Sequence, residues 1–110
     1  MPIFIVRGRY TKESMAAMLQ KPDDRAEALR PVFALGGGRL IDYYMTFGED
    51  DFLIILEAPD EKVMLQALIP PAATGAVTGL KTCLALRSTE AKEAFAQAKA
   101  RAGDYRRPGG

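Results

Sequence analysis

Residues 39–58 read RLIDYYMTFGEDDFLIILEA. From Leu40 to Phe47 the hydrophobic period is two, which predicts a β-strand. Gly48-Glu49-Asp50 has the composition of a tight turn, and Asp51 to Ala58 forms a second apolar segment. The stretch therefore predicts an antiparallel β-hairpin.

The second strand of this hairpin is apolar on both faces. Its alternating side chains are Phe52, Ile54 and Leu56 on one side, and Leu53 and Ile55 on the other. Such a strand is expected to be buried on both sides. Because the helices can cover only one side, a second copy packed sheet to sheet would cover the other, which predicts a two-fold homodimer or a higher oligomer built from it.

The remaining chain predicts two further strands and four helical segments. The strands are Pro2–Tyr10 and Val77–Leu86, and the helices begin after Thr11, after Asp23 or Asp24 and after Pro59-Asp60, with Ser88 or Thr89 as the N-cap of the last one. Gly36-Gly37-Gly38 is expected to end the second helix, and Pro70-Pro71 with Gly75 the third.

The predicted order is β-α-β-β-α-β followed by a C-terminal helix. This is the split βαβ or ferredoxin-like arrangement, an α+β fold with helices on one face of an antiparallel sheet. We expect a single domain over residues 1–103 and a flexible tail over residues 104–110.

Composition argues against nucleic-acid binding and membrane insertion, and it indicates a cellular compartment. The 110 residues carry a formal net charge of +1, without the basic excess expected of a nucleic-acid-binding protein. The apolar runs are much shorter than the roughly 20 residues of a membrane span. A single cysteine, Cys83, suits a reducing compartment, so a cytoplasmic location is expected.

The sequence contains no histidine. This excludes histidine-dependent triads, histidine-bearing zinc sites and histidine-ligated haem, and we expect neither a metal nor another cofactor. The carboxylates of Glu49-Asp50-Asp51 lack the ligand spacing of a calcium loop and are interpreted as a solvated turn. Cys83 lies mid-strand and is predicted to be an inert, buried thiol.

Five stretches resemble the GYD domain family. In order along the chain they are Gly8-Arg9-Tyr10-Thr11, Arg25-Ala26-Glu27-Ala28, Gly37-Gly38-Arg39-Leu40, Tyr44-Met45-Thr46-Phe47-Gly48-Glu49-Asp50-Asp51-Phe52 and Glu57-Ala58-Pro59-Asp60. The resemblance implies a ferredoxin-like protomer that pairs into a dimeric α/β barrel. The family is named for a Gly-x-Tyr-Asp turn, and Asp50 stands here at the tyrosine position.

The first strand suggests a binding site. If Phe4 and Val6 face the helices, Arg7 and Arg9 face the opposite side of the sheet, which would line the barrel. Two interpretations remain open. The arginines pair with Asp42 or Glu57 on neighbouring strands, or they bind the carboxylate of a small molecule.

Tyr44 and Lys81 complete the predicted site. Tyr44 would offer an aromatic ring with a hydroxyl group, and Lys81 would add a third cation beside Arg7 and Arg9. The function predicted first is therefore a homodimeric protein that binds a small anionic or aromatic molecule in a pocket lined by the sheet.

Two other functions remain open. One is a cofactor-independent monooxygenase or isomerase, a function found among proteins of the dimeric α/β-barrel superfamily. With no histidine present, its acid-base groups would be Tyr43, Tyr44, Asp42 or Glu57. The other is a purely structural role, in which the sheet face serves only as an interface between copies.

Overall fold

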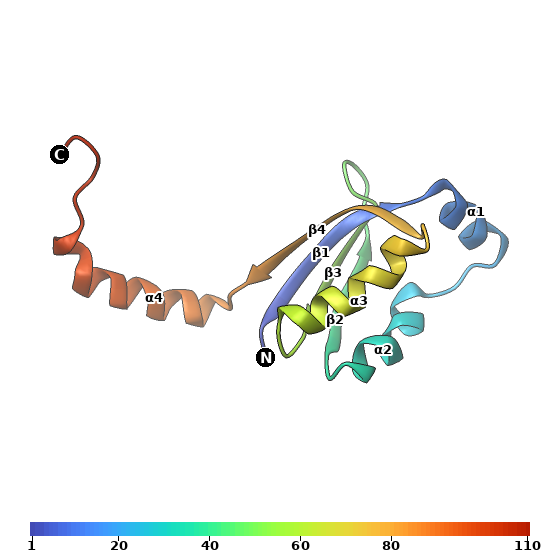
Figure 1. The fold of residues 1–110 in the computed structure, drawn as a ribbon, viewed down its shortest axis with the longest axis horizontal. Helices are drawn as coiled ribbons and strands as arrows, with labels where there is room; N and C mark the ends of the chain where they lie inside the picture. Colours follow the sequence, from blue (N-terminus) through green and yellow to red (C-terminus); the bar gives the residue numbers. More distant parts are fainter.

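The computed structural model describes all residues, 1–110 (Figure 1). Its elements are β1 (Ile3–Tyr10), α1 (Lys12–Gln20), α2 (Arg25–Leu35), β2 (Arg39–Met45), β3 (Phe52–Glu57), α3 (Glu61–Ala73), β4 (Val77–Ala85), α4 (Ser88–Arg101) and the short 3-10 helix η1 (Ala102–Asp104). This order confirms the predicted β-α-β-β-α-β pattern with a C-terminal helix.

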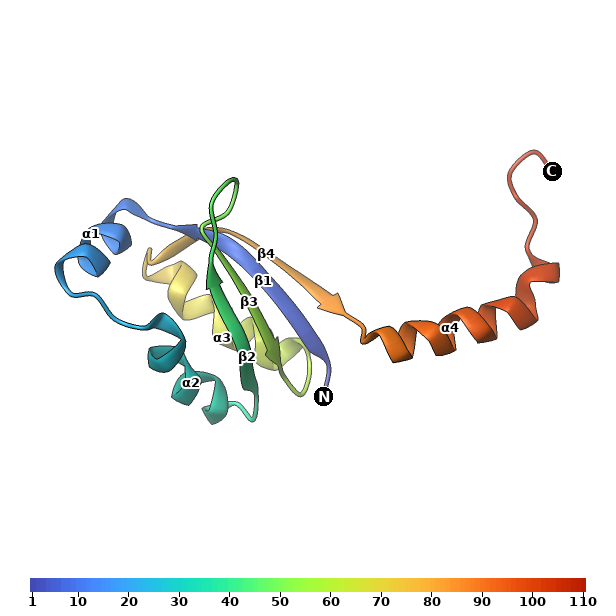
Figure 2. The same ribbon diagram turned by 180° about the vertical axis from the view of Figure 1, so that it is seen from behind.

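The four strands form one antiparallel sheet in the order β2-β3-β1-β4. Helices α1, α2 and α3 lie on one side of this sheet, and the other side is uncovered (Figures 1 and 2). We call these sides the helix face and the open face. The architecture is the ferredoxin-like α+β fold that the sequence predicts.

Side-chain caps begin three of the helices. The Thr11 hydroxyl accepts a hydrogen bond from the Ser14 backbone N–H at 3.3 Å, and Asp24 and Asp60 cap α2 and α3 in the same way. Gly37, with φ of 82°, follows the end of α2, where glycine adopts the left-handed conformation without strain. The predicted glycine terminus of this helix is confirmed.

Two helix boundaries differ from the prediction. Helix α3 continues through Pro70 and Pro71 to Ala73, because proline has a φ close to the helical value and these residues lie in its last turns. Gly75, with φ of 77°, follows the end of α3 as predicted. Helix α4 begins at Ser88 with Arg87 in the N-cap position, so neither Ser88 nor Thr89 caps it. The Glu90 carboxylate accepts a hydrogen bond from the Arg87 backbone N–H at 3.2 Å.

The hydrophobic core lies between the helix face and the helices. Its buried side chains are Phe4, Val6, Leu40, Phe52, Ile54, Leu56, Ala58 and Met64. On β1 and β3, Ile3, Ile5, Leu53 and Ile55 alternate with core residues, point to the open face and are only half-buried. A single chain therefore buries one face of its sheet.

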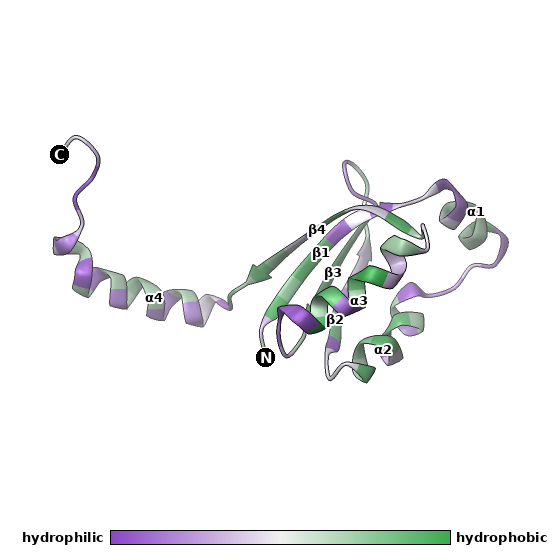
Figure 3. Cartoon of the chain, viewed as in Figure 1, coloured by the Kyte–Doolittle hydropathy of each residue, from purple (hydrophilic) through white to green (hydrophobic).

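The C-terminal helix projects away from this domain (Figures 1 and 2). The Cα radius of gyration is 18.1 Å, compared with about 13 Å for a compact chain of this length. The only extensive contact of α4 is with η1. Apolar residues run along the strands, whereas along α4 they are mixed with hydrophilic ones (Figure 3). None of the helices has the length and hydropathy needed to cross a membrane.

Candidate ligand-binding site

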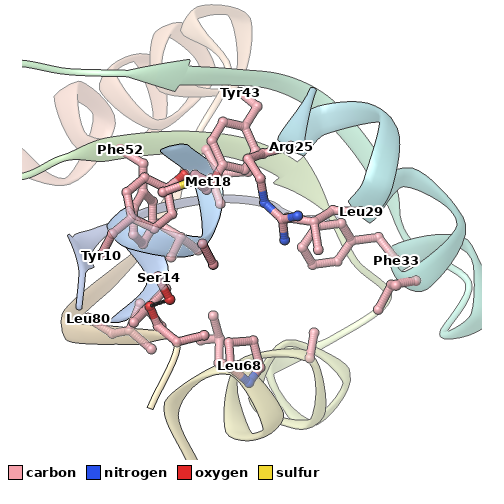
Figure 4. A pocket seen from close by; sticks show the side chains of 18 residues that line it. Tyr10, Ser14, Met18, Arg25, Leu29, Phe33, Tyr43, Phe52, Leu68 and Leu80 are labelled. Carbon is pink, nitrogen blue, oxygen red and sulfur yellow. Dashed lines mark hydrogen bonds between the residues drawn. The ribbon is translucent and has the colours of Figure 1, made fainter. Parts of the chain in front are cut away.

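A cavity of about 250 Å³ lies between the helix face and the three helices that cover it (Figure 4). Its lining comes from every strand and from α1, α2 and α3. The lining side chains are mainly apolar: Val6, Tyr10, Ser14, Ala17, Met18, Arg25, Leu29, Val32, Phe33, Tyr43, Phe52, Ile54, Ala67, Leu68, Pro71, Ala76, Val77 and Leu80. An apolar cavity of about 150 Å³ can hold benzene, so this one has room for a larger ring compound.

Gly8 fixes the packing of β1 beneath this cavity. A Cβ atom at Gly8 would lie 2.7 Å from Cζ of Phe52 and 3.0 Å from Cδ2 of Leu80. Because Phe52 and Leu80 both line the cavity, a larger residue at position 8 would push the cavity lining out of place.

Three aromatic rings gather at one end of the cavity (Figure 4). The ring of Phe52 lies 5.0 Å from that of Tyr10 and 6.2 Å from that of Tyr43, measured between centroids. The hydroxyl groups of Tyr10 and Tyr43 form a hydrogen bond with each other. The cluster therefore places a pair of phenol groups in an otherwise apolar lining.

Burial raises the pKa of Tyr10 well above the usual phenol value, and it raises the pKa of Tyr43 as well. In both residues the main cause is desolvation, which disfavours the phenolate. The hydrogen bond with Tyr43 raises the pKa of Tyr10 further. Both groups are thus protonated at neutral pH and can donate or accept hydrogen bonds, but neither is suited to act as a general base.

Arg25 brings a positive charge to the cavity. It is the first residue of α2, and its guanidinium group reaches toward the cavity (Figure 4). Its Nη1 lies 2.9 Å from Oδ2 of Asp23 in a partly exposed ion pair, and its positive charge acts to lower the pKa of Tyr10 and of Tyr43, against the larger effect of burial. Ser14, by contrast, donates its hydroxyl hydrogen to the Ala76 carbonyl at 2.7 Å.

The sequence-predicted site residues lie on the opposite side of the sheet. Arg7 pairs with Leu53 on β3 and with Lys81 on β4, and Tyr44 on β2 pairs with Leu53. The register thus places Tyr44, Arg7 and Lys81 in one row across the open face. Arg9 follows Arg7 on the same face, as expected, and none of the four lines the cavity.

Two of these cations contact the hairpin turn. Lys81 Nζ lies 2.9 Å from Oδ1 of Asp50, and Arg9 Nε donates a hydrogen bond to the Glu49 carbonyl at 2.8 Å. The Arg7 side chain forms neither a hydrogen bond nor an ion pair in the single chain. Asp50, at the motif position of the turn, therefore binds the lysine of the predicted site.

The predicted pairing of Arg7 or Arg9 with Glu57 is wrong. Glu57 Oε1 lies 3.3 Å from Arg39 Nη2 and 3.0 Å from Arg87 Nη2, at the other end of the sheet. Glu57 pairs with Ile3 across the strands, and three residues of β1 lie between Ile3 and Arg7. Asp42 forms no ion pair.

Cys83 is exposed, which corrects the prediction of a buried thiol. It pairs with Ile5 across the strands and therefore points to the open face. The prediction of burial rested on the mid-strand position of Cys83, but within one chain nothing covers this side of β4.

Sequence reasoning did not find the cavity. A register shift between Leu40 and Asp42 inserts Ile41 as an extra residue, so that Leu40 and Tyr43 share the helix face. Strict alternation from Leu40 would turn Tyr43 to the open face. Tyr43 was considered only as an acid-base group, because no local pattern reveals the bulge. Tyr10 continues the alternation of Phe4 and Val6 on β1, a signal that could have placed it on the helix face, whereas no sequence pattern brings Arg25 to the cavity.

The structure offers no evident metal site. No group of three or more aspartate, glutamate or cysteine side chains is arranged to hold a metal ion. The cavity, with two phenols and one guanidinium in an apolar lining, suits an organic ring compound that carries a hydrogen-bonding or anionic group.

The fold and the cavity define a small ferredoxin-like α+β protein. A scan against protein families matches the GYD domain over residues 4–95, so the chain belongs to the GYD domain family. Membership is consistent with the dimeric α/β-barrel superfamily. Among solved structures, the chain is similar to the crystal structure of FFRP-DM1, with 16% identity, a TM-score of 0.45, and coverage of 78% of this chain and 100% of that one. A search of curated proteins found no match.

Proposed function

We propose that this GYD-family protein is a homodimer that binds a small ring-containing organic molecule with an anionic or hydrogen-bonding group. The observation that carries this proposal is the apolar cavity of about 250 Å³ with Tyr10, Tyr43 and Arg25 in its lining. Ligand sites typically combine an apolar lining with a few polar groups that fix the orientation of the ligand.

The polar groups lie where they could orient such a ligand. The Tyr10–Tyr43 pair would hydrogen-bond an oxygen atom of the ligand, while the Arg25 guanidinium would attract a carboxylate or a similar anion. Phe52, between the two tyrosines, would stack on or pack against a ring. These contacts support binding and require no reaction.

The homodimer is supported by the open face. Ile3, Ile5, Leu53 and Ile55 form a half-exposed apolar patch on the two central strands. Contiguous apolar patches of this kind mark protein interfaces, and a second open face would cover this one.

The test uses the fluorescent probe 1-anilinonaphthalene-8-sulfonate, which combines aromatic rings with an anionic group. Leu68→Trp would fill the cavity, whereas the matched change Leu65→Trp lies on the exposed side of α3. We expect Leu68→Trp to weaken probe binding by about tenfold or more, equivalent to about 1.4 kcal/mol, and Leu65→Trp to leave it nearly unchanged. The probe is excited at a wavelength that tryptophan does not absorb, so the introduced tryptophan does not contribute to the fluorescence.

Equal binding by the two variants would place the probe outside the cavity and contradict the proposal. Native mass spectrometry of the protein from its own source adds an independent measurement. We expect a dimer that retains a small organic molecule, and Arg25→Gln should lower the retained fraction. A dimer that never carries an added mass would favour a purely structural role.

A second candidate site is the row of Tyr44, Arg7 and Lys81, with Arg9 beside it. The observation that favours it is Arg7, whose guanidinium group has no partner within the chain and lies next to Lys81. In a dimer this row would face the second copy, where an anionic ligand would offset the clustered positive charge. Arg7→Gln should abolish sulfonate binding there and leave binding in the cavity intact.

A further inference from the structure

Helix α4 is a 14-residue arm with one apolar side. Ala91, Ala94, Phe95 and Ala98 recur at helical spacing, and the Phe95 side chain is 78% exposed. The small alanines would let another helix or a surface approach closely, and Phe95 would insert as an anchor. In the single chain this side of α4 packs against nothing beyond η1.

An isolated helix of this length is marginally stable in water. Isolated helices shorter than about 12–15 residues are rarely stable, and most helical stability in proteins comes from packing of an apolar side. The alanine-rich sequence favours helix formation, but a docking partner would explain better why α4 is a stable helix.

The geometry at Arg87 directs α4 away from its own domain. Arg87 Nη2 lies 3.0 Å from Glu57 Oε1 at the end of the sheet, and its backbone N–H donates to Glu90. These contacts hold the start of α4 in line with the exit of β4 (Figure 1). Folding α4 back onto its own helices would require a reversal at this point.

A suitable surface exists between α2 and α3. Their crevice, a hollow of about 280 Å³, is lined mostly by apolar groups: Val32, Phe33, Leu35, Gly36, Gly38, Leu56, Glu57, Ala58, Val63, Met64, Gln66 and Ala67. Leu35 at its rim is 89% exposed, a degree of exposure unusual for a leucine beside a core. An apolar crevice between two helices is a typical docking site for an amphipathic helix.

Charge favours docking of the arm on a domain of the same sequence. Residues 87–110 carry six basic and three acidic side chains, whereas residues 1–86 carry nine basic and eleven acidic ones. Helix α4 itself carries three basic and two acidic side chains, and the rest of the excess lies in Arg87 and the residues after α4. This C-terminal segment is positive and the domain negative, which would bring the two together and favour this pairing over a contact between two C-terminal segments.

We propose that α4 is an exchanged arm, which docks its Ala91–Ala98 side in the crevice between α2 and α3 of a second copy of this chain, with Phe95 as the anchor. This inference deepens the homodimer of the proposed function and rests on it. Leu35 and Val32 of the receiving copy would contact the arm, and the exchange would be reciprocal in a two-fold dimer.

The first experiment is sedimentation velocity over a range of concentrations. Phe95→Asp places a charge at the anchor position of α4, and the matched variant Gln97→Asp places the same charge on the side of the helix turned away from Phe95. We expect Phe95→Asp to raise the dimer dissociation constant by more than about tenfold, as for an aromatic hot spot, and Gln97→Asp to leave it within about twofold. Leu35→Asp should act like Phe95→Asp, and Leu19→Asp, on α1, should not.

The second experiment tells exchange from folding back. Copies labelled with heavy and light nitrogen are mixed, allowed to exchange and treated with an amine-reactive cross-linker. We expect cross-links from Lys92 or Lys99 to Lys62 that join a heavy to a light chain. Cross-links confined to one isotope type, formed in a chain that is otherwise dimeric, would show that α4 folds onto its own domain and overturn the proposal.

The two proposals fail in different ways. A dimer unaffected by Phe95→Asp overturns the exchanged arm and leaves the homodimer standing. A chain that sediments as a monomer at all concentrations overturns both the arm and the homodimer. Probe binding in the cavity is measured separately with Leu68→Trp, because Leu68 lines the cavity and not the crevice.

Discussion

The two faces of the sheet are formed by the same strands but differ sharply in how far their side chains are buried within one chain. On β3, Phe52, Ile54 and Leu56 are almost completely buried beneath the helices, whereas Leu53 and Ile55 remain half-exposed. Both sets are equally apolar in sequence. The difference shows that hydrophobicity alone does not determine burial here, because the chain supplies helices for one face only.

The two faces also carry different chemistry. The helix face holds the cavity, with Tyr10, Tyr43 and Arg25 at its lining, while the open face holds the row of Tyr44, Arg7 and Lys81. Stability of the single chain thus comes mainly from the helix face. The open face and α4 are left for contacts beyond the chain.

The largest expected effect compares two leucines on β3. Leu56→Ala removes a side chain that is 1% exposed and should lower the free energy of unfolding by about 2–5 kcal/mol. Leu53→Ala, on the open face, should cost less than about 1 kcal/mol at concentrations where the chain is monomeric. Urea unfolding monitored by circular dichroism measures both.

Protein concentration sharpens this comparison. If a second copy covers the open face, the cost of Leu53→Ala should grow with concentration, because the folded state is then stabilised by association. The cost of Leu56→Ala should not. Equal losses of unfolding free energy for the two variants at low concentration would contradict the difference in burial between the two faces.

A smaller effect is expected for Gly8→Ala. The new methyl group would lie 2.7 Å from Cζ of Phe52, so the aromatic cluster has to shift, at a cost of about 1–3 kcal/mol. The same change should reduce the affinity of the cavity for the anilinonaphthalene probe. Gly103→Ala, in η1, meets no atom within 4 Å and involves no positive φ, so it serves as a control for an added methyl group without a clash.

The phenol pair predicts a pH dependence. Burial raises the pKa of Tyr10 and Tyr43 above the value of about 10 in an unfolded chain. The stability that depends on the protonated phenols is therefore complete below about pH 10 and is lost as the pH rises above it. Tyr10→Phe should cost about 1 kcal/mol at neutral pH and make the loss above pH 10 shallower.

Unfolding in urea at several pH values measures this dependence. A matched Tyr44→Phe variant changes a phenol on the open face and should cost nearly nothing at neutral pH. An unchanged slope above pH 10 in Tyr10→Phe would show that Tyr10 is not the group that loses stabilisation.

The sequence predicts the fold well where the signals are local. The hairpin within residues 39–58 combines period-two segments with a glycine turn, and Asp24 and Gly36-Gly37 delimit α2 as expected. Alternation with Phe4 and Val6 also predicts that Arg7 and Arg9 lie on the face of the sheet opposite the helices. Local patterns of this kind need no knowledge of distant residues.

The candidate site depends on features that no local pattern carries. The extra residue Ile41 in β2 turns Tyr43 toward the helices, and it becomes visible only in the register with β3. The cavity itself is the space left between α1, α2 and α3 over the sheet, a property of tertiary packing. Likewise, the ion pair at the start of α4 joins Arg87 to Glu57, two side chains 30 residues apart.

The smallest expected effect concerns Asp50, at the tyrosine position of the family motif. Its carboxylate lies 2.9 Å from Lys81 Nζ, but the lysine side chain is 58% exposed, so solvent screens the pair. Asp50→Asn should cost about 0.2–1 kcal/mol, and a double-mutant cycle with Lys81→Met at low and high salt measures the pair alone. A coupling energy that falls with salt is expected. If it does not fall, Asp50 acts through the shape of the turn, and the row of cations on the open face has no electrostatic link to the motif.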